Sequence, residues 1–295
     1  MATPDRGSEL NINEDPLIAI TRPHFDRPPL IEQAITVSFE KSDEFSLGDF
    51  GLFWREIQSD FPFSESHPVI DQALERFENP EVQSPGVRLL EPGFLPRCFY
   101  KSEDGRELVQ VQNDRFTYNW IRVDEDEYPR SEVLIPRFTD LFSRFIRFLV
   151  EGRCYDPPKI IQCELTNVNI IPVSDLGGTF ADAPKAFKLN ALREIPKTVR
   201  IESYSYFNHY LLQREDGVPF GRLHIQLVPS LAIDDEQPVY KLQLTARGKP
   251  DSSGLEGSLR FFVMARDAIN SAFMASTTKA AQHRWGYQDG LRSPD

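Results

Sequence analysis

Two histidines come nearest to a metal-binding arrangement in this sequence. His209 and His224 fall on two consecutive predicted strands joined by a turn at 215–219, so they lie opposite or diagonal to one another. A zinc site needs a third protein ligand, and none is evident near this hairpin. Because His209 has apolar neighbours, a hydrogen-bonded structural histidine is the favoured interpretation. The sequence therefore predicts no metal site and no cofactor.

Glu164 is the carboxylate best placed for acid–base chemistry. It lies on the predicted strand QCELTNVN, with Gln162 and Thr166 on its side. A general base needs a neighbour that shifts its pKa, and the sequence shows no such partner. A polar residue on the open face of a sheet is the favoured alternative. We therefore name no catalytic residue, and the sequence favours a protein that is not an enzyme.

The motif DLGGT at 175–179 resembles the phosphate-binding hairpin of sugar-kinase-like ATPases. In that fold two strands flank the motif, whereas a proline-rich loop follows it here. The sequence contains no second phosphate-binding motif. The favoured interpretation is a surface loop, part of a longer loop predicted for residues 172–197.

The stretch VQVQNDRFTYNW at 109–120 alternates apolar and polar residues so regularly that it predicts two strands joined at Asn113–Asp114. With this turn, Gln112 lies opposite Arg115 and Val111 lies opposite Phe116. A slip of one residue would invert both faces, so the register is fixed. The apolar residues face a core, and the other face carries Gln110, Gln112, Arg115, Thr117 and Asn119.

Apolar periodicity predicts further strands and long helices in the rest of the chain. The polar, proline-punctuated residues 64–85 predict a loop with one short helical turn. Together the elements predict an α+β fold, with a large antiparallel sheet and long amphipathic helices packed on one face. The remaining strands are expected at 30–40, 87–90, 97–102, 159–172, 199–213, 221–229 and 239–248, and the helices at 48–61, 134–149 and 255–282.

The order of elements is similar before and after Pro157–Pro158, although no residue-level repeat is visible. We expect a single α+β domain over residues 28–285 with two quasi-equivalent halves, about 28–152 and 157–285. Two separate domains are the alternative. Composition predicts a flexible arm at 1–27 and a C-terminal tail at 286–295.

If helices cover one face of the sheet, the other face is open to a partner. It would carry amides, phenols and cations with almost no carboxylate, which is typical of recognition surfaces. The alternative is the solvated side of an ordinary antiparallel sheet. The residues predicted to bind a partner are Gln112, Arg115, Asn119, Tyr204, Tyr206, Tyr210, His224, Gln226, Lys241 and Arg247.

The net charge of −12 and the isoelectric point near 5.0 argue against a nucleic-acid binder, because phosphate contact needs a basic face. Three cysteines without CxxC spacing predict reduced thiols in a cytoplasmic protein. The N-terminal residues contain no apolar signal-peptide region, and no apolar run approaches the roughly 18 residues of a membrane span. We therefore expect no membrane association.

Several short motifs occur in order along the chain: RPPLIE at 27–32, LVQVQNDRFTYNW at 108–120, Tyr128–Pro129, QCELTNVN at 162–169 and HRWG at 283–286. Through them the chain resembles a sporadically distributed bacterial family of uncharacterised proteins, known only by a numbered family model. The resemblance implies no catalytic residues. Sporadic occurrence suggests mobile genomic islands, where defence genes collect, which is an association and not a mechanism.

The expected function is that of a non-enzymatic binding or assembly protein, whose open sheet face engages a protein partner or a second copy of the chain. One alternative is an enzyme or small-ligand-binding protein with a cleft between the two halves, using Glu164, His224 or the loop at 172–197. A second alternative is nucleic-acid binding through the same face, which would weaken steeply with salt.

Overall fold

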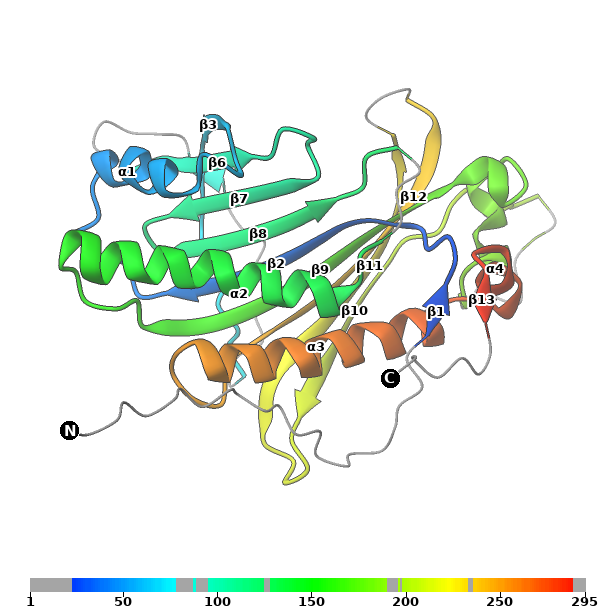
Figure 1. Cartoon of the computed structure of the whole chain (residues 1–295). Coiled ribbons are helices and arrows are strands. Elements are labelled where there is room, and N and C mark those ends of the chain that lie inside the picture. Colours follow the sequence, from blue (N-terminus) through cyan, green and yellow to red (C-terminus); the bar gives the residue numbers. More distant parts are fainter. Residues whose placement is uncertain are drawn as a thin grey trace.

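A nine-stranded antiparallel sheet dominates the computed structural model, which describes residues 23–77, 87–88, 95–124, 128–189, 196, 198–232 and 236–288 (Figure 1). Every pair of neighbouring strands in this sheet is antiparallel. From one edge to the other the strands are β10 (Tyr206–Gln213), β11 (Pro219–Leu231), β12 (Pro238–Gly248), β9 (Ile160–Pro172), β2 (Leu30–Phe39), β8 (Arg115–Ile121), β7 (Glu107–Gln112), β6 (Arg97–Lys101) and β3 (Phe63–His67).

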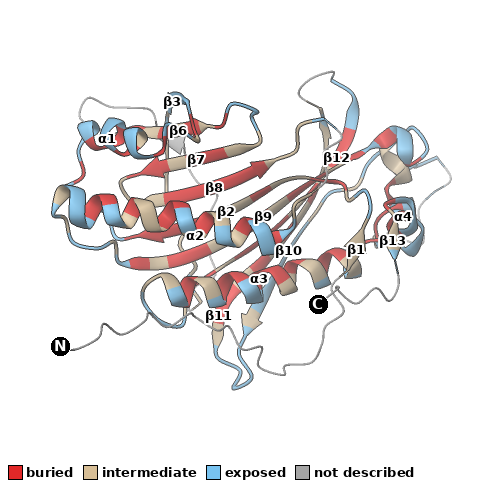
Figure 2. Cartoon of the chain, viewed as in Figure 1, coloured by how far each residue is buried: buried red, intermediate tan, exposed pale blue. Residues whose placement is uncertain are grey.

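Three helices cover one face of this sheet (Figures 1 and 2). Many of the side chains packed between the helices and the sheet are phenylalanines. The ring of Phe116 in β8 lies 5.3 Å from the rings of both Phe142 and Phe145. Phe262 joins the same core, 5.2 Å from Phe138. These observations confirm the α+β class and the large antiparallel sheet. The helices are α1 (Leu47–Ile57), α2 (Ser131–Arg147, continued by a π-helical turn at Phe148–Gly152) and α3 (Leu255–Ser276).

The centre of the sheet is the antiparallel pair β2–β9, in which Ile35 lies opposite Leu165. Beside β2 lies β8, the last strand before α2, followed by β7 and β6. Beside β9 lies β12, the last strand before α3, followed by β11 and β10. The order outward from the centre is therefore similar for four strands on each side, and β3 is an additional edge strand beyond β6. The central pair joins the two sides into a continuous sheet.

The helix predicted at 255–282 is in fact two helices. α3 ends at Ser276, and α4 (Lys279–Arg284) begins after Thr278. The hydroxyl of Thr278 accepts a hydrogen bond from the N–H of Ala281 at 3.2 Å, as an N-cap does. This cap starts a new helix and is the physical reason for the break. Among the described residues, no helix has the length and apolarity needed to cross a membrane.

The predicted arm and tail contact one another where the structure describes them. β1 (His24–Phe25) pairs antiparallel with β13 (Tyr287–Gln288). The ring of Phe25 lies edge-on to Phe273 of α3, with centroids 5.5 Å apart. Regular structure therefore begins before residue 28 and continues past 285, and the rest of the arm and tail, 1–22 and 289–295, lies outside the described residues.

The prediction of a loop at 64–85 is wrong for most of residues 64–70, which form strands, and is confirmed for residues 71–77. β3 occupies its start, and β4 (Val69–Ile70) pairs with β5 (Val87–Arg88). Residues 71–77 follow without regular secondary structure. We call residues 68–77 the crossing segment, because they run over the face of the sheet opposite the helices.

The loop predicted at 172–197 contains two short 3₁₀ helices, Val173–Asp175 and Phe180–Lys185. The DLGGT residues 175–179 run from the end of the first helix to the start of the second. Strand β9 precedes the motif, but a helix follows it, so the flanking strands of a phosphate-binding hairpin are not formed. This arrangement supports the surface-loop interpretation.

The three cysteines are free thiols. Cys98 and Cys163 are buried, whereas Cys154 is exposed. Burial raises the pKa of Cys163 to about 12, so this thiol is protonated at neutral pH.

Candidate functional site

Polar side chains line the face of the sheet opposite the helices, which we call the polar face. The register sets them side by side: Thr36 of β2 lies between Thr117 of β8 and Glu164 of β9. Glu164 lies opposite Arg247 of β12, and Arg247 lies opposite Arg222 of β11. The hydroxyls of Thr36 and Thr117 are hydrogen-bonded at 2.9 Å. Along this row of side chains, hydroxyls therefore lie on β2 and β8, and charged groups lie on β9, β12 and β11.

Most residues predicted to bind a partner lie on the polar face, as the register requires. Those on the first half of the sheet lie near its centre, and those on the second half lie on β11 and β12. They are Gln112, Arg115, Asn119, His224, Gln226, Lys241 and Arg247.

The three predicted tyrosines do not lie on this face. β10 pairs with β11 so that His209 is opposite His224, which leaves Tyr206 and Tyr210 pointing to the helix side. Tyr204 and Tyr206 pack against the hydrophobic core there. The prediction that Tyr204, Tyr206 and Tyr210 share a face with His224 is therefore wrong. The physical reason is that β10 is an edge strand with aromatic residues on both faces, so its alternation does not indicate which face is inward.

The crossing segment covers one end of the polar face, which is not bare as the sequence predicted. The N–H of Ile70 donates to Oε1 of Gln112 at 3.0 Å, and Nε2 of Gln112 donates to the carbonyl of Ile70 at 3.1 Å. The side-chain amide of Gln162, on β9, makes a second pair of hydrogen bonds of this kind. It accepts from the N–H of Glu75 at 2.8 Å and donates to the carbonyl of Ala73 at 2.9 Å. Side-chain amides thus replace a neighbouring strand for this backbone.

Glu75 in the crossing segment is the centre of an ion cluster. Its side chain is only 6% exposed and accepts hydrogen bonds from Arg222 and, at 2.6 Å, from Nε2 of His224. Nη1 of Arg247 lies 3.7 Å away. Burial raises the pKa of Glu75, but His224 and the two arginines outweigh it, and the net effect lowers the pKa. The charged carboxylate therefore holds the crossing segment on β11 and β12.

Glu164 is not the isolated carboxylate that the sequence indicated. Nε of Arg247 donates to it, and the hydroxyl of Thr166 lies 3.3 Å from its Oε1. The missing partner was three strands further along the chain, and only the β9–β12 register reveals it. The charge of Glu164 is compensated within the sheet, which favours a structural role over general-base chemistry.

A cavity of about 180 Å³ opens on the polar face beside the crossing segment. Its wall draws side chains from both sides of the β2–β9 pair, so it lies over the seam between the two sides of the sheet. Hydroxyls, amides and charged groups make up most of the wall. The wall residues are Ala34, Thr36, Ile70, Arg97, Gln110, Gln112, Arg115, Thr117, Asn119, Glu164, Thr166 and Gln243.

Two arginines supply positive charge to the cavity wall. Nη1 of Arg97 donates to Gln110 at 3.4 Å, and Nη2 of Arg115 donates to the carbonyl of Asp71 at 3.1 Å. The Nε of each arginine is buried and has no hydrogen-bond partner among the described residues. Burial lowers the pKa of both, and the charge of Arg115 lowers that of Arg97 further. Guanidinium groups stay protonated even so, and an anion in the cavity would relieve this repulsion.

Arg97 was not among the predicted binding residues, although the sequence contained a signal for it. The strand predicted at 97–102 places Cys98 and Tyr100 on the core side, and both are buried in the structure. Alternation then puts Arg97 on the polar face. No comparable pattern marked Glu75, because residues 71–77 have no apolar periodicity.

His209 and His224 lie edge to face, with ring centroids 4.6 Å apart. Nε2 of His224 is engaged by Glu75. Within the part of the chain that the structure describes, no three His, Cys, Asp or Glu side chains are grouped so that they could hold a metal ion. The pair therefore gives no support to a metal centre.

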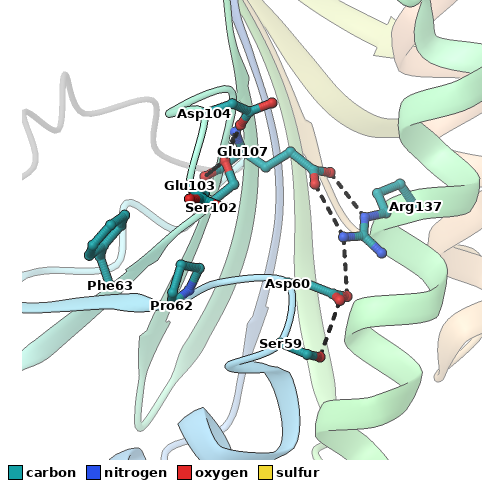
Figure 3. A pocket seen from close by; sticks show the side chains of 9 residues that line it. All are labelled: Ser59, Asp60, Pro62, Phe63, Ser102, Glu103, Asp104, Glu107 and Arg137. Atoms are coloured by element: carbon teal, nitrogen blue, oxygen red, sulfur yellow. Dashed lines mark hydrogen bonds and ion pairs between the residues drawn. The ribbon is translucent and has the colours of Figure 1, made fainter.

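A second cavity of about 720 Å³ opens where the end of α1 meets the β6–β7 turn and α2 (Figure 3). Four of its nine wall residues are acidic, and one is basic. Figure 3 shows Arg137 reaching from α2 toward Glu107 and Asp60. The wall residues are Ser59, Asp60, Pro62, Phe63, Ser102, Glu103, Asp104, Glu107 and Arg137.

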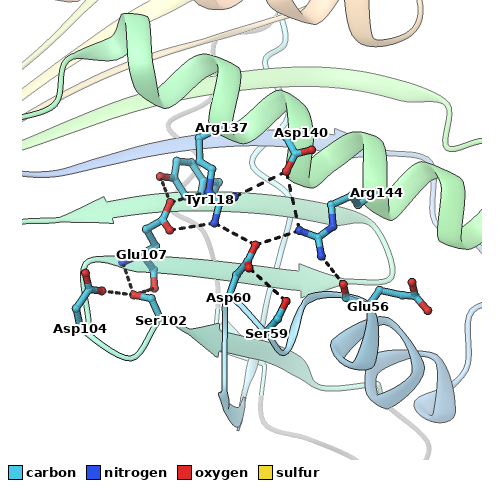
Figure 4. Close-up of polar contacts among 10 residues, drawn as sticks. All are labelled: Glu56, Ser59, Asp60, Ser102, Asp104, Glu107, Tyr118, Arg137, Asp140 and Arg144. Atoms are coloured by element: carbon cyan, nitrogen blue, oxygen red, sulfur yellow. Dashed lines mark hydrogen bonds and ion pairs between the residues drawn. The ribbon is translucent and has the colours of Figure 1, made fainter.

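Arginines already compensate the central carboxylates of this second cavity (Figure 4). Arg137 binds Glu107 through two hydrogen bonds, Nε to Oε1 at 3.0 Å and Nη2 to Oε2 at 3.1 Å. The hydroxyl of Tyr118 donates to the same carboxylate at 2.6 Å. Nη1 of Arg144 lies 3.1 Å from Asp60. This network ties α1, β7 and α2 together, and it leaves the smaller cavity on the polar face as the better ligand site.

No protein-family model matches the chain, and a search of curated proteins finds no match.

Proposed function

We propose that this protein is a non-enzymatic binding protein whose polar face holds a carboxylate group of a partner in the cavity beside Arg97 and Arg115. The observation that carries the proposal is the presence of two arginines in the wall of one small cavity, close enough for the charge of Arg115 to lower the pKa of Arg97. A carboxylate accepts hydrogen bonds from a guanidinium with good geometry and compensates its charge. The amides of Gln110 and Asn119 add polar groups to the same wall.

The size of the cavity supports a small acidic group. Sites for drug-sized ligands usually measure about 300–1,000 Å³. At about 180 Å³ this cavity fits one acidic side chain or a small organic acid. A protein partner that inserts an Asp or Glu side chain is the preferred source, because the surrounding face offers further amides and cations for contact.

We infer that the two sides of the sheet are quasi-equivalent halves, each closed by an amphipathic helix, α2 or α3. Their common strand order outward from β2–β9 supports this. Because β2 and β9 pair directly, a ligand would sit over a seam and not in a cleft between halves. Thr36 and Arg115 line the cavity from one half, Glu164 and Gln243 from the other.

Catalysis and nucleic-acid binding receive less support from the same face. Glu75 and Glu164 are both engaged by arginines, so neither is free to act as a base. Glu32 also lies on this face, where it accepts a hydrogen bond from Asn119 at 2.5 Å. Three carboxylates on one face oppose a phosphate backbone.

Calorimetric titration with two acids tests the proposal. One is succinate, and the other is the tripeptide Gly-Glu-Gly blocked at both ends. The wild-type protein is expected to bind at least one of them, and the double variant R97M/R115M to bind it about tenfold to hundredfold more weakly, because charged hydrogen bonds are lost. Preference for the tripeptide indicates a protein partner, and preference for succinate indicates a free organic acid.

The matched control is R55M, which removes an exposed positive charge from α1 on the opposite side of the sheet. It should bind as the wild type does. Equal weakening by R55M would assign the effect to net charge. Absence of binding by the wild-type protein to both acids would refute the proposal.

A further inference from the structure

The two edge strands of the sheet differ in how they are protected. β3 is short, follows Pro62, and carries Glu65, which is ion-paired with Lys101 at 2.7 Å. β10 has eight residues, YFNHYLLQ, with no charged side chain and no proline. Natural edge strands are usually short, charged or interrupted, because unpaired backbone groups otherwise recruit another strand. From Tyr206 to Leu212, β10 has no charge, proline or bulge that would keep another strand from pairing with it. A bulge occurs only at its end, between Leu212 and Gln213.

Apolar side chains are exposed on both faces of β10. On the polar face Phe207 is 61% exposed and Leu211 is 51% exposed, and on the helix side Tyr210 is 50% exposed. Figure 2 shows much of this strand coloured as exposed. Six of the fourteen large exposed hydrophobic residues of the described part lie on β10 or in the segments just before and after it, between residues 199 and 218. They are Val199, Ile201, Phe207, Tyr210, Leu211 and Val218.

We propose that β10 pairs antiparallel with β10 of a second copy of this chain, so that two nine-stranded sheets join across a twofold axis. β10 hydrogen-bonds to β11 alone among the described strands, which leaves its outer backbone groups to a strand-shaped partner. A twofold interface requires a surface that complements itself. An uncharged strand meets that requirement even though each chain carries a net charge of −12.

One register makes the pairing self-complementary on both faces. When His209 of one chain lies opposite His209 of the second copy, Phe207 lies opposite Leu211 of the second copy on the polar face. On the other face Tyr206 lies opposite Leu212 of the second copy. Opposed aromatic and aliphatic side chains stabilise antiparallel sheets. This axis also keeps both polar faces on the same side of the joined sheet, which would display two acid-binding cavities together.

Charge-swap variants at Phe207 and Leu211 test this pairing. Light scattering after gel filtration should give wild-type protein twice the 33.9 kDa of one chain. F207K/L211K and F207E/L211E each place like charges opposite one another, so each should be monomeric. An equimolar mixture of the two variants should recover the dimer, because each lysine then lies opposite a glutamate.

F63K is the control, because Phe63 is also exposed, at 54%, but lies on the protected edge strand β3. It should remain dimeric. Thermal unfolding of each variant confirms that the monomers are folded, as expected for exposed positions. A monomeric wild-type protein, a dimeric lysine variant or a mixture of folded variants that does not associate would each overturn the proposal. None of these outcomes bears on acid binding by Arg97 and Arg115.

Discussion

Glu75 and His224 lie 149 residues apart in the sequence, yet Nε2 of the histidine is 2.6 Å from Oε1 of the glutamate. The glutamate belongs to the crossing segment, and the histidine to β11 in the second half of the sheet. Arg222 and Arg247 complete the cluster around the same carboxylate. A single buried side chain therefore joins the crossing segment to the polar face of β11 and β12.

Replacing Glu75 with glutamine should destabilise the protein by about 3 kcal/mol at pH 7, because it leaves the largely buried Arg222 without its counter-charge, whereas Arg247 keeps Glu164. The folded-state pKa of Glu75 is lowered, so its contribution is fully present above the ordinary glutamate pKa of about 4.3 and is lost as the pH falls toward the folded-state value. Urea unfolding of the wild type and E75Q over a pH series measures the difference, which should shrink in acid.

The control for this experiment is E151Q, an exposed glutamate at the end of the α2 segment. It should change the free energy of unfolding by less than about 0.5 kcal/mol at any pH. A pH-independent difference between the wild type and E75Q would show that packing, and not charge, holds the crossing segment.

Arg137→Met should cost about 1–3 kcal/mol, because Glu107 would lose two charged hydrogen bonds at a partly exposed site. Burial raises the pKa of Asp60, but Arg144 and Arg137 outweigh it and lower this pKa overall. The substitution should therefore raise the pKa of Asp60, which an NMR pH titration can follow. R147M, an exposed arginine on the same helix, should leave both quantities unchanged. An unshifted Asp60 would mean that Arg144 alone sets its pKa.

Gly248→Ala should destabilise the protein by about 1–3 kcal/mol through overpacking. Gly248 lies opposite Gly221 in the β11–β12 pair, and an added Cβ would overlap the carbonyl oxygen of Phe220 and lie 2.6 Å from Cα of Gly221. The matched change Gly51→Ala, on the exposed face of α1 with nothing within 4 Å, should stabilise by about 0.5–1 kcal/mol. Thermal unfolding of both variants gives the comparison, and equal signs would contradict it.

The proposed dimer should weaken in acid. Burial lowers the pKa of His209, and the charge of His224 lowers it further, with Arg222 and Arg247 acting in the same direction and Glu75 opposing them. His209 is therefore neutral above the ordinary histidine pKa of about 6.5 and becomes charged only below it. Protonation would set two like charges opposite one another at the twofold axis.

Sedimentation of the wild type between pH 7.5 and pH 5, values that bracket the histidine range of about 5–8, measures this effect. The dimer fraction should fall in acid for the wild type and stay constant for H209Q. An equal fall in both proteins would assign the effect to groups other than His209.

The register of the central strands could be predicted from the sequence because one face of each is buried. The alternation in residues 109–120 predicted Gln112 opposite Arg115 and Val111 opposite Phe116, and both pairings are confirmed. Burial of Val111 and Phe116 in the hydrophobic core makes any slip costly. At the edge strand β10, assigning the apolar side of the alternation to the buried face gave the wrong face. Apolar residues are exposed on both faces of β10, so a slip of one residue would bury no fewer apolar side chains.

The candidate site could be predicted only in part for a related reason. Gln112, Arg115 and Asn119 sit on strands whose alternation fixes their direction. The crossing segment is held by the amides of Gln112 and Gln162 and by the charge of Glu75, contacts between residues distant in sequence. Such contacts leave no local periodicity, so a loop was the natural prediction.

The crossing segment also has a consequence for how the chain is made. Glu75 leaves the ribosome 147 residues before Arg222, to which it is bound in the folded protein. At about 5–20 residues per second, this delay is roughly 7–30 s. During that time the crossing segment lacks half of its docking surface, and β2 lacks β9. The nascent first half should therefore be the stage at which this protein depends most on chaperones, and the fastening of Glu75 should mark its end.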